Sequence, residues 1–191
     1  ADARRYHLAY SRAITAIAQA CKSNDIRENP GISVKLSALH PRYEVAQEDR
    51  VMRDLVPRLR SLALLAKSAG MGLNIDAEEA DRLDLSLDVI ETVLRDPSFA
   101  GWDGFGVVVQ AYGKRAGAAL DALYAMAERY DRRINIRLVK GAYWDTEMKL
   151  AQVQGLPDFA LFTTKAATDV SYICLARKLF ALSDRLFPQF A

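Results

Sequence analysis

The sequence contains only two cysteines and two histidines among its 191 residues. Cys21 and Cys174 lie far apart in the chain, which excludes the disulfide framework of a small secreted domain. Together with His7 and His40 they also lack the spacing of a metal-ligand cluster, so we expect no metal site. This composition is typical of a protein from a reducing, cytoplasmic compartment.

Long hydrophobic runs are also missing. No apolar stretch reaches the roughly 18–20 residues that a membrane span needs, and the charged, helix-like start does not resemble a signal peptide. The formal net charge is +2 and 26% of residues are charged. This mixed surface gives no indication of nucleic-acid binding through this segment.

What the sequence does contain is a regular alternation of strand-like and helix-like segments. β-branched, apolar runs predict strands at 32–37, 73–78, 106–112, 134–140 and 160–165, with a further strand beginning near 187. Apolar residues at helical spacing predict helices at 3–21, 44–69, 82–95, 114–130, 145–154 and 166–182. Such βα alternation indicates a parallel sheet, either doubly wound or a (β/α)8 barrel.

A polar residue late in each predicted strand favours the barrel. These residues are Lys35, Asp76, Gln110, Arg137 and Thr163. Strands of a doubly wound sheet are covered on both faces and are more uniformly apolar, whereas barrel strands end at the mouth of an active site. Because a complete barrel needs ~200 residues or more, we predict an α/β fold in which residues 1–191 form an incomplete (β/α)8 TIM-type barrel of about five parallel strands.

Four of these polar residues form the candidate site. Parallel pairing would bring Lys35, Asp76, Gln110 and Arg137 to one rim. Two cations and a carboxylate suit a zwitterionic or carboxylate substrate. The amide of Gln110 suits an imide edge, and Arg137 suits developing negative charge. The alternative is an internal ion-pair network that fills the barrel centre.

The segment after Arg137 offers further binding groups. Lys140-Gly141-Ala142 would hold a phosphate through its charge and backbone N–H groups, or would be an ordinary βα turn. Tyr143 and Trp144 would pack on a planar ring, or simply belong to the core or rim. Thr163 and Lys165 suit phosphate or ribose, and strand-end solvation is the simpler explanation.

Several motifs resemble the proline dehydrogenase domain of bacterial bifunctional proline utilisation A. They are SVKLSALHP at 33–41, NIDAEEA at 74–80, VQAY at 109–112, RLVKGAYWD at 137–145 and TDVSY at 168–172. They cover nearly the whole chain, in the order and with the spacing of that family. The resemblance implies a distorted (β/α)8 barrel that holds FAD and oxidises L-proline to Δ1-pyrroline-5-carboxylate by hydride transfer to flavin N5.

The resemblance also implies roles for individual residues. Lys35, Asp76 and Arg137 would be catalytic, with Lys35 on the proline carboxylate, Asp76 near the amine and Arg137 by flavin N5. Ala142 and Tyr143 would border the proline site. The cofactor contacts would be Val108, Gln110, Arg137, Val139, Lys140, Gly141, Ala142, Trp144, Thr163 and Lys165. Electrons would pass to membrane quinone through peripheral association with the inner membrane, and an aldehyde dehydrogenase domain would lie in the same parent chain.

The sequence departs from the family pattern in ways that affect activity. The family's first barrel strand would precede residue 1, its Thr-His-Asn strand would follow Ala191, and its last helix, with paired arginines, is absent. Thr164 stands where a basic residue is expected. Residues 1–191 would thus be the central part of the domain, inactive alone. Two alternatives remain: a Schiff-base lyase that uses Lys35, and a non-catalytic barrel fragment.

Overall fold

A computed structural model describes residues 2–191 and contains one sheet of five parallel strands. The strands are β1 (Ile32–Val34), β2 (Leu73–Ile75), β3 (Phe105–Gln110), β4 (Ile134–Val139) and β5 (Leu186–Phe190). Their order in the sheet is their order in the chain, β1-β2-β3-β4-β5. A doubly wound sheet reverses its strand order at a switch point, so this topology confirms the barrel-type prediction.

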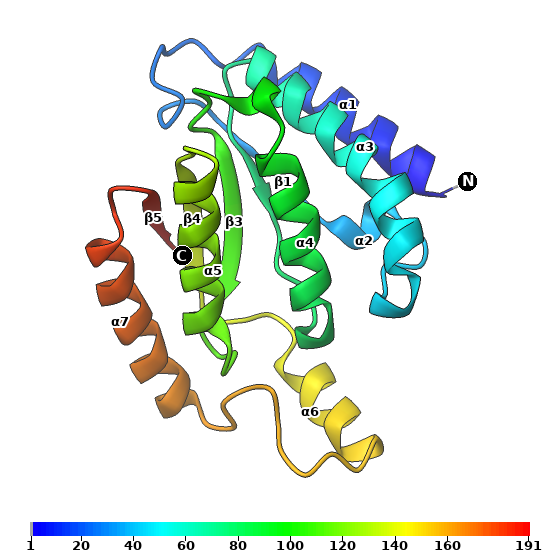
Figure 1. Ribbon diagram of the computed structural model, residues 1–191, viewed down its shortest axis with the longest axis vertical. Coiled ribbons are helices and arrows are strands. Elements are labelled where there is room, and N and C mark those ends of the chain that lie inside the picture. The colour runs from blue at the N-terminus through cyan, green and yellow to red at the C-terminus, as the bar shows by residue number, and fades with distance from the viewer. Residues whose placement is uncertain (1) are drawn as a thin grey trace.

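Helices follow the strands and cover one face of the sheet (Figure 1). The α-helices are α1 (Asp2–Ala18), α2 (Leu36–Leu39), α3 (Glu48–Ser68), α4 (Leu83–Leu94), α5 (Ala116–Arg129), α6 (Trp144–Val153) and α7 (Lys165–Ala181). Three short 3-10 helices occupy Val45–Gln47, Ala80–Arg82 and Pro97–Phe99. Neighbouring helices pack in sequence, α3 on α4, α4 on α5 and α5 on α7, as consecutive βα units require.

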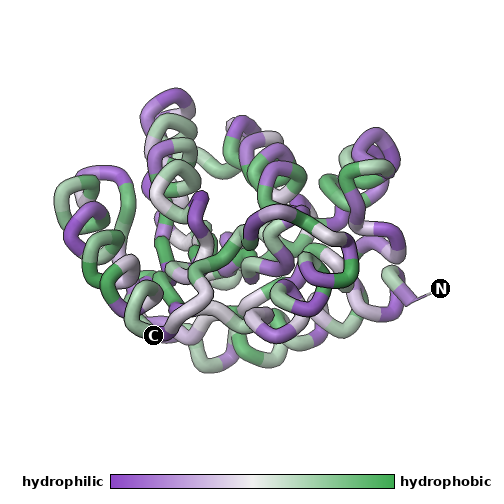
Figure 2. The backbone as a smooth tube through the Cα atoms, turned by 90° about the horizontal axis from the view of Figure 1, so that it is seen from below, coloured by the Kyte–Doolittle hydropathy of each residue, from purple (hydrophilic) through white to green (hydrophobic). Residues whose placement is uncertain are grey.

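The hydrophobic core lies between the sheet and these helices. Strand residues of one parity, including Val34, Ile75, Val107 and Ile136, are buried and pair with one another across the sheet. The amphipathic helices meet them with buried residues such as Leu59. In Figure 2 the helices show hydrophobic and hydrophilic stretches in turn, as expected for helices buried on one side.

Residues of the opposite parity face away from the helices and form a polar, concave surface. Ser33, Asn74, Gly106 and Asn135 lie at one level of the sheet because they are register partners. A guanidinium N–H of Arg137 on β4 donates to Ser33 Oγ on β1 over 3.0 Å. In a flat sheet β1 and β4 would be about 14 Å apart, at ~4.8 Å per strand. The two side chains could not span that separation across a flat sheet, so the sheet is curved.

One predicted strand and several predicted boundaries are wrong. Residues 160–165 are not a strand: Leu161 makes only an isolated antiparallel bridge to Gly113, and Lys165 already begins α7. The fifth strand is β5 instead, where the sequence predicted a strand only beginning. β1 and β2 are also shorter than predicted, so Lys35 and Asp76 lie just beyond them. Short apolar runs do not distinguish a strand from a packed loop by periodicity.

The helix boundaries are closer to the prediction. α4 begins at Leu83, directly after the 3-10 turn over Ala80–Arg82, within one residue of the predicted start. α3 runs as one helix through Pro57. Among residues 2–191 no helix has both the length and the apolar character for a membrane crossing.

Candidate active site

The ends of four adjacent strands bring the predicted polar residues to one end of the concave face. Val34 pairs with Ile75, so Lys35 and Asp76 follow at the same level. Arg137 pairs with Val108 at that level and with Gln189 on its other side. Gln110 pairs with Val139, one side-chain layer further along. The prediction that all four occupy equivalent strand positions is therefore wrong for Gln110.

These side chains surround a hollow of about 500 Å³. Its lining contains every predicted site residue except Trp144, Thr163 and Lys165. The lining residues are Lys35, Asp76, Ala77, Val108, Gln110, Arg137, Val139, Lys140, Gly141, Ala142, Tyr143 and Ala191. The structure thus brings the residues together as predicted, while their individual roles stay predictions.

Lys35 contacts both a hydroxyl and a carboxylate in the hollow. Its Nζ donates to the Tyr143 hydroxyl over 3.1 Å and lies 3.8 Å from an Asp76 carboxylate oxygen. The hydrogen bond to Tyr143 is the main reason that the pKa of Lys35 is raised. The nearby Asp76 charge raises this pKa further, whereas partial burial of Lys35 lowers it. Lys35 is therefore a protonated cation at neutral pH. It suits a carboxylate ligand far better than the nucleophilic attack that a Schiff base requires.

Arg137 forms the floor of the hollow. Its guanidinium donates to Ser33 and also borders a second, smaller cavity of about 170 Å³ toward the other end of the strands. In the part of the chain that the structure describes, no carboxylate lies within ion-pair distance of Arg137. Placing the Arg137 charge at a half-buried strand position costs free energy when no carboxylate pairs with it. This cost is offset if the guanidinium binds another anion.

Gln110 ties two strand-end loops together. Its amide nitrogen donates to the Glu78 carbonyl over 2.9 Å, and its amide oxygen accepts from the Ala142 N–H over 3.0 Å. The Glu78 carboxylate is itself buried, accepting from the Ser37 N–H at 2.9 Å and pairing with Arg82 at 3.2 Å. The loops after β1, β2 and β4 are therefore held by hydrogen bonds on both sides of the hollow.

Gly141 and Tyr112 shape the loop after β4. Gly141 has φ +147°, and an added Cβ would lie 2.2–2.5 Å from atoms of the Tyr112 ring. The Tyr112 hydroxyl accepts from the Tyr143 N–H at 3.1 Å. Burial raises the pKa of Tyr112 to about 12, so the phenol stays protonated. The buried ring thus determines where the backbone of residues 141–143 runs.

The remaining predicted residues lie beside the hollow. Lys140 and Lys165 both pair with Asp169, each at 2.6 Å, and the two lysines lower the pKa of this carboxyl. Trp144 begins α6 with its ring partly exposed and donates its indole N–H to the Phe162 carbonyl at 3.1 Å. Thr163 is exposed. These residues extend a polar, cationic rim away from Lys35.

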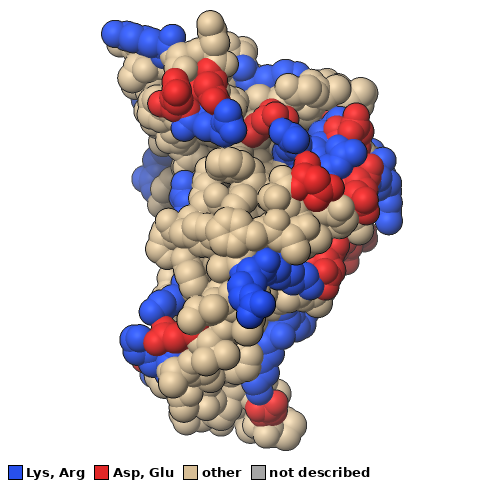
Figure 3. Space-filling view, turned by 90° about the vertical axis from the view of Figure 1, so that its left-hand side faces the viewer, with Lys and Arg blue, Asp and Glu red and all other residues tan. Residues whose placement is uncertain are grey.

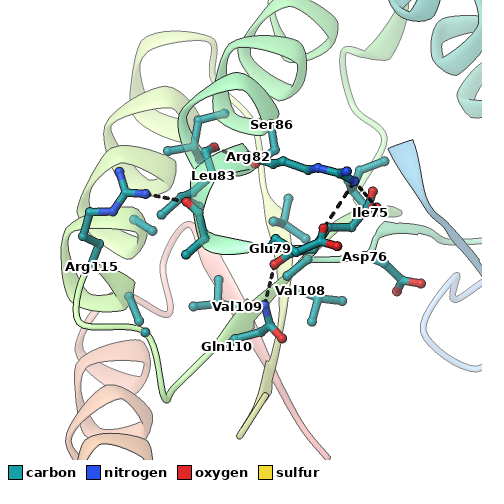
Figure 4. Close-up of a pocket in the computed structure, with 18 of the residues that line it drawn as sticks. Ile75, Asp76, Glu79, Arg82, Leu83, Ser86, Val108, Val109, Gln110 and Arg115 are labelled. Carbon is teal, nitrogen blue, oxygen red and sulfur yellow. Dashed lines mark hydrogen bonds and ion pairs between the residues drawn. The ribbon is translucent and has the colours of Figure 1, made fainter. Parts of the chain in front are cut away.

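A different cavity, of about 70 Å³, lies on the helix side of the sheet (Figure 4). Most of its lining is apolar and comes from β2, β3, α4 and α5. In Figure 4, Asp76 points away from this cavity, whereas Gln110 reaches toward the segment that carries Glu79. Because the charged groups converge on the concave face instead, we place the candidate site there.

Sequence reasoning missed several supporting residues. Ser33 lies two residues before Lys35, so alternation along the strand places both side chains on one face. This pattern could have predicted that Ser33 faces the site and contacts Arg137. Tyr112 follows Gln110 closely, but its contact with Gly141 depends on tertiary packing. Nothing in the sequence links Asp169 to Lys140, because the pair forms only when α7 packs beside β4.

Comparison with known proteins identifies relatives of this chain. The family model for proline dehydrogenase matches residues 1–191. The bifunctional protein PutA of Salmonella typhimurium is 55% identical over 191 residues, which cover 100% of this chain and 14% of that protein. PutA of Rhizobium meliloti is 56% identical over 192 residues, covering 100% of this chain and 15% of that protein. The chain therefore spans 14–15% of the length of these relatives.

Solved structures show the same fold. A crystal structure of a proline utilization A mutant from Bradyrhizobium japonicum superposes with a TM-score of 0.97 at 56% identity, covering 99% of this chain and 20% of that chain. Proline utilization A from Bdellovibrio bacteriovorus, inactivated by N-propargylglycine, has a TM-score of 0.89 at 29% identity, covering 99% of this chain and 21% of that chain.

Proposed function

The chain belongs to the proline dehydrogenase family, and from this premise we propose that it forms the centre of an FAD-dependent L-proline oxidising site. The observation that carries the proposal is the hollow in which Lys35, Asp76 and Arg137 converge. A cation beside a carboxylate complements the carboxylate and amine of an amino acid. The related enzyme inactivated by N-propargylglycine, an N-substituted amino acid, supports the same substrate class.

The residues of the hollow fit FAD by their donor chemistry. Arg137 offers a cation without a carboxylate partner, and Gln110 keeps one amide hydrogen and one lone pair free after its two bonds. Lys140 and Lys165 supply positive charge for a diphosphate, while the exposed ring of Trp144 offers a flat apolar face. Val108, Val139, Gly141, Ala142 and Thr163 would complete the contacts. When bound, FAD would supply the hydride acceptor that no side chain provides.

The side chains would bind and orient the substrate. Lys35 would hold the proline carboxylate, and Tyr143, which bonds Lys35 Nζ, would fix the position of that cation. Asp76 would lie near the amine, with Ala142 bordering the pocket. Arg137 would place positive charge where negative charge develops on the cofactor. Electrons would then pass to membrane quinone, because the parent chain would associate peripherally with the membrane. The same parent chain would also carry an aldehyde dehydrogenase domain.

The test uses the full-length protein. L-proline should bleach its flavin absorbance, and Lys35→Ala should raise KM for proline roughly tenfold or more, as expected for a lost charge-assisted contact. Lys149→Ala, an exposed lysine on α6, is the matched control and should leave KM unchanged. Borohydride trapping of a carbonyl substrate on Lys35 would instead support the lyase, and a flavin-free, proline-insensitive protein would support the non-catalytic fragment.

We further propose that residues 1–191 alone bind FAD weakly or not at all and do not oxidise proline. The concave face lies open in this chain, since β1 and β5 each pair on one side only within residues 2–191. A binding site open to water loses much of the strength of its electrostatic contacts. A yellow preparation of residues 1–191 that is bleached by proline would contradict this proposal.

A further inference from the structure

Asp169, which pairs with both Lys140 and Lys165 in a cluster at the rim, has no role in the function proposed above. Asp169 Oδ1 forms an ion pair with Lys140 Nζ, and Oδ2 accepts a hydrogen bond from Lys165 Nζ, both at 2.6 Å. Lys140 follows β4, whereas Lys165 begins α7, so the two lysines come from separate elements. Their side chains are 52% and 78% exposed, and without Asp169 nothing else in the cluster would hold these two like charges together.

Asp169 itself has a firmly placed backbone. The preceding residue, Thr168, is buried. Two and three residues after Asp169, Ser171 Oγ donates to the Ala111 carbonyl over 2.7 Å and Tyr172 OH donates to the Leu138 carbonyl over 3.4 Å. These bonds attach this part of α7 to the ends of β3 and β4. The carboxylate is therefore presented from a fixed position beside the hollow, while the lysines it binds are mobile by nature.

The geometry points to Asp169 as a positioning residue that holds Lys140 and Lys165 at one place, so that a paired-cation site for the cofactor diphosphate exists before the cofactor binds. This inference rests on the proposed FAD function and adds a residue to it. Each ammonium has three donors, so at least two remain for phosphate oxygens while the lysine is paired with Asp169. Pre-organisation of this kind lowers the ordering cost of binding.

The inference makes a prediction whose sign differs from that of simple electrostatics. Asp169→Asn removes one negative charge and makes the rim more positive. Long-range attraction alone would then tighten the binding of an anionic cofactor. If Asp169 instead gathers the lysines, its loss lets them separate, and binding weakens roughly two- to fivefold, the range of an exposed ion pair.

The experiment measures the FAD dissociation constant of the full-length protein by fluorescence titration after flavin removal. Asp158→Asn is the matched control. Asp158 lies in the loop between α6 and α7 and is an exposed acid that also pairs with a lysine, Lys114. It changes the net charge equally without touching the lysine pair. We expect weaker binding for Asp169→Asn and unchanged binding for Asp158→Asn.

A second measurement separates positioning from general damage. Lys165→Ala should weaken FAD binding less in the Asp169→Asn background than in the wild type, since the lysine is already released there. Tighter or unchanged binding by Asp169→Asn, or equal effects of Lys165→Ala in both backgrounds, overturns the inference. If Asp169→Asn does not fold, Asp169→Glu, which keeps the charge but moves the carboxylate, is tested for the same weakening. A wild-type protein that binds no FAD would instead refute the proposed function.

Discussion

Replacing Gly141 by alanine tests how the site loop is built. The added Cβ would lie 2.2 Å from Tyr112 Cε2, 2.3 Å from Cδ2 and 2.5 Å from Cζ. Real Cβ contacts are not that short, so either the buried ring or the loop must move. A non-glycine residue at φ +147° adds backbone strain of ~1–3 kcal/mol. Overpacking adds ~1–3 kcal/mol, so Gly141→Ala should cost about 2–6 kcal/mol of unfolding free energy.

The assay is equilibrium unfolding in urea, followed by tryptophan fluorescence. With an m-value of ~2 kcal/mol/M, the midpoint should fall by about 1–3 M. Gly101→Ala is the matched control, because Gly101 also has positive φ but has no atom within 4 Å of an added Cβ. Gly101→Ala should lower the unfolding free energy only by the backbone strain, about 1 kcal/mol.

A double-mutant cycle then isolates the steric part. Tyr112→Val deletes the three ring atoms nearest to the added Cβ. In that background Gly141→Ala should cost only the backbone strain, so the two substitutions should couple by roughly 1–3 kcal/mol. If Gly141→Ala costs no more than Gly101→Ala, or if the cycle shows no coupling, then the ring of Tyr112 does not fix the loop as described.

Two further predictions concern stability. Asp96 accepts hydrogen bonds from Arg60 and from the Ser98 N–H, which lower its pKa to about 2. Its folded pKa is depressed, so it stabilises the protein above its unfolded pKa of 3.8, and this contribution disappears as the pH falls toward 2. Asp96→Asn should therefore lower the unfolding free energy by about 2 kcal/mol at pH 7, and a difference that persists unchanged at pH 2 would contradict the assignment. Leu59→Ala, at a fully buried position, should cost ~2–5 kcal/mol in urea unfolding. Leu8→Ala, at a position that is 55% exposed, should stay within ~0.5 kcal/mol, and equal effects would contradict the assigned core.

The general fold was predictable because each βα unit repeats the same local signals. A β-branched run, a polar residue at its end and a helical pattern after it occur several times, and four of the predicted strands match β1 to β4. The error at 160–165 has a specific cause. Leu161 is buried, and Phe162 N–H bonds the Tyr112 carbonyl, so the segment looks apolar because it packs across the end of β3.

The candidate site was predictable where chemistry and strand position coincide. Lys35, Asp76 and Arg137 are charged residues in or next to apolar runs, which is visible in the sequence and explains why they were found together. The supporting contacts were not predictable. Gln110 bonds to the backbone of Glu78 and Ala142, and backbone partners leave no trace in residue identity.

The exposed side of α7 and β5 is mostly uncharged. Val170, Ile173, Phe180 and Phe190 are all exposed large hydrophobic residues in these two elements. Figure 3 shows a wide area without charged side chains on this side of the molecule, with charges above and below it. Apolar surface of this extent is a hazard for isolated residues 1–191, because it promotes self-association.

The order of the strands bears on how the chain folds. Every strand pairs with the next one in the sequence, so Ile32 meets Leu73 and Gly106 meets Asn135 without waiting for distant segments. The largest separation is between β4 and β5, where Ile134 meets Leu186. At ~5–20 residues per second of synthesis, β5 leaves the ribosome roughly 3–10 s after β4. The first four strands therefore have time to assemble while the last is still being made.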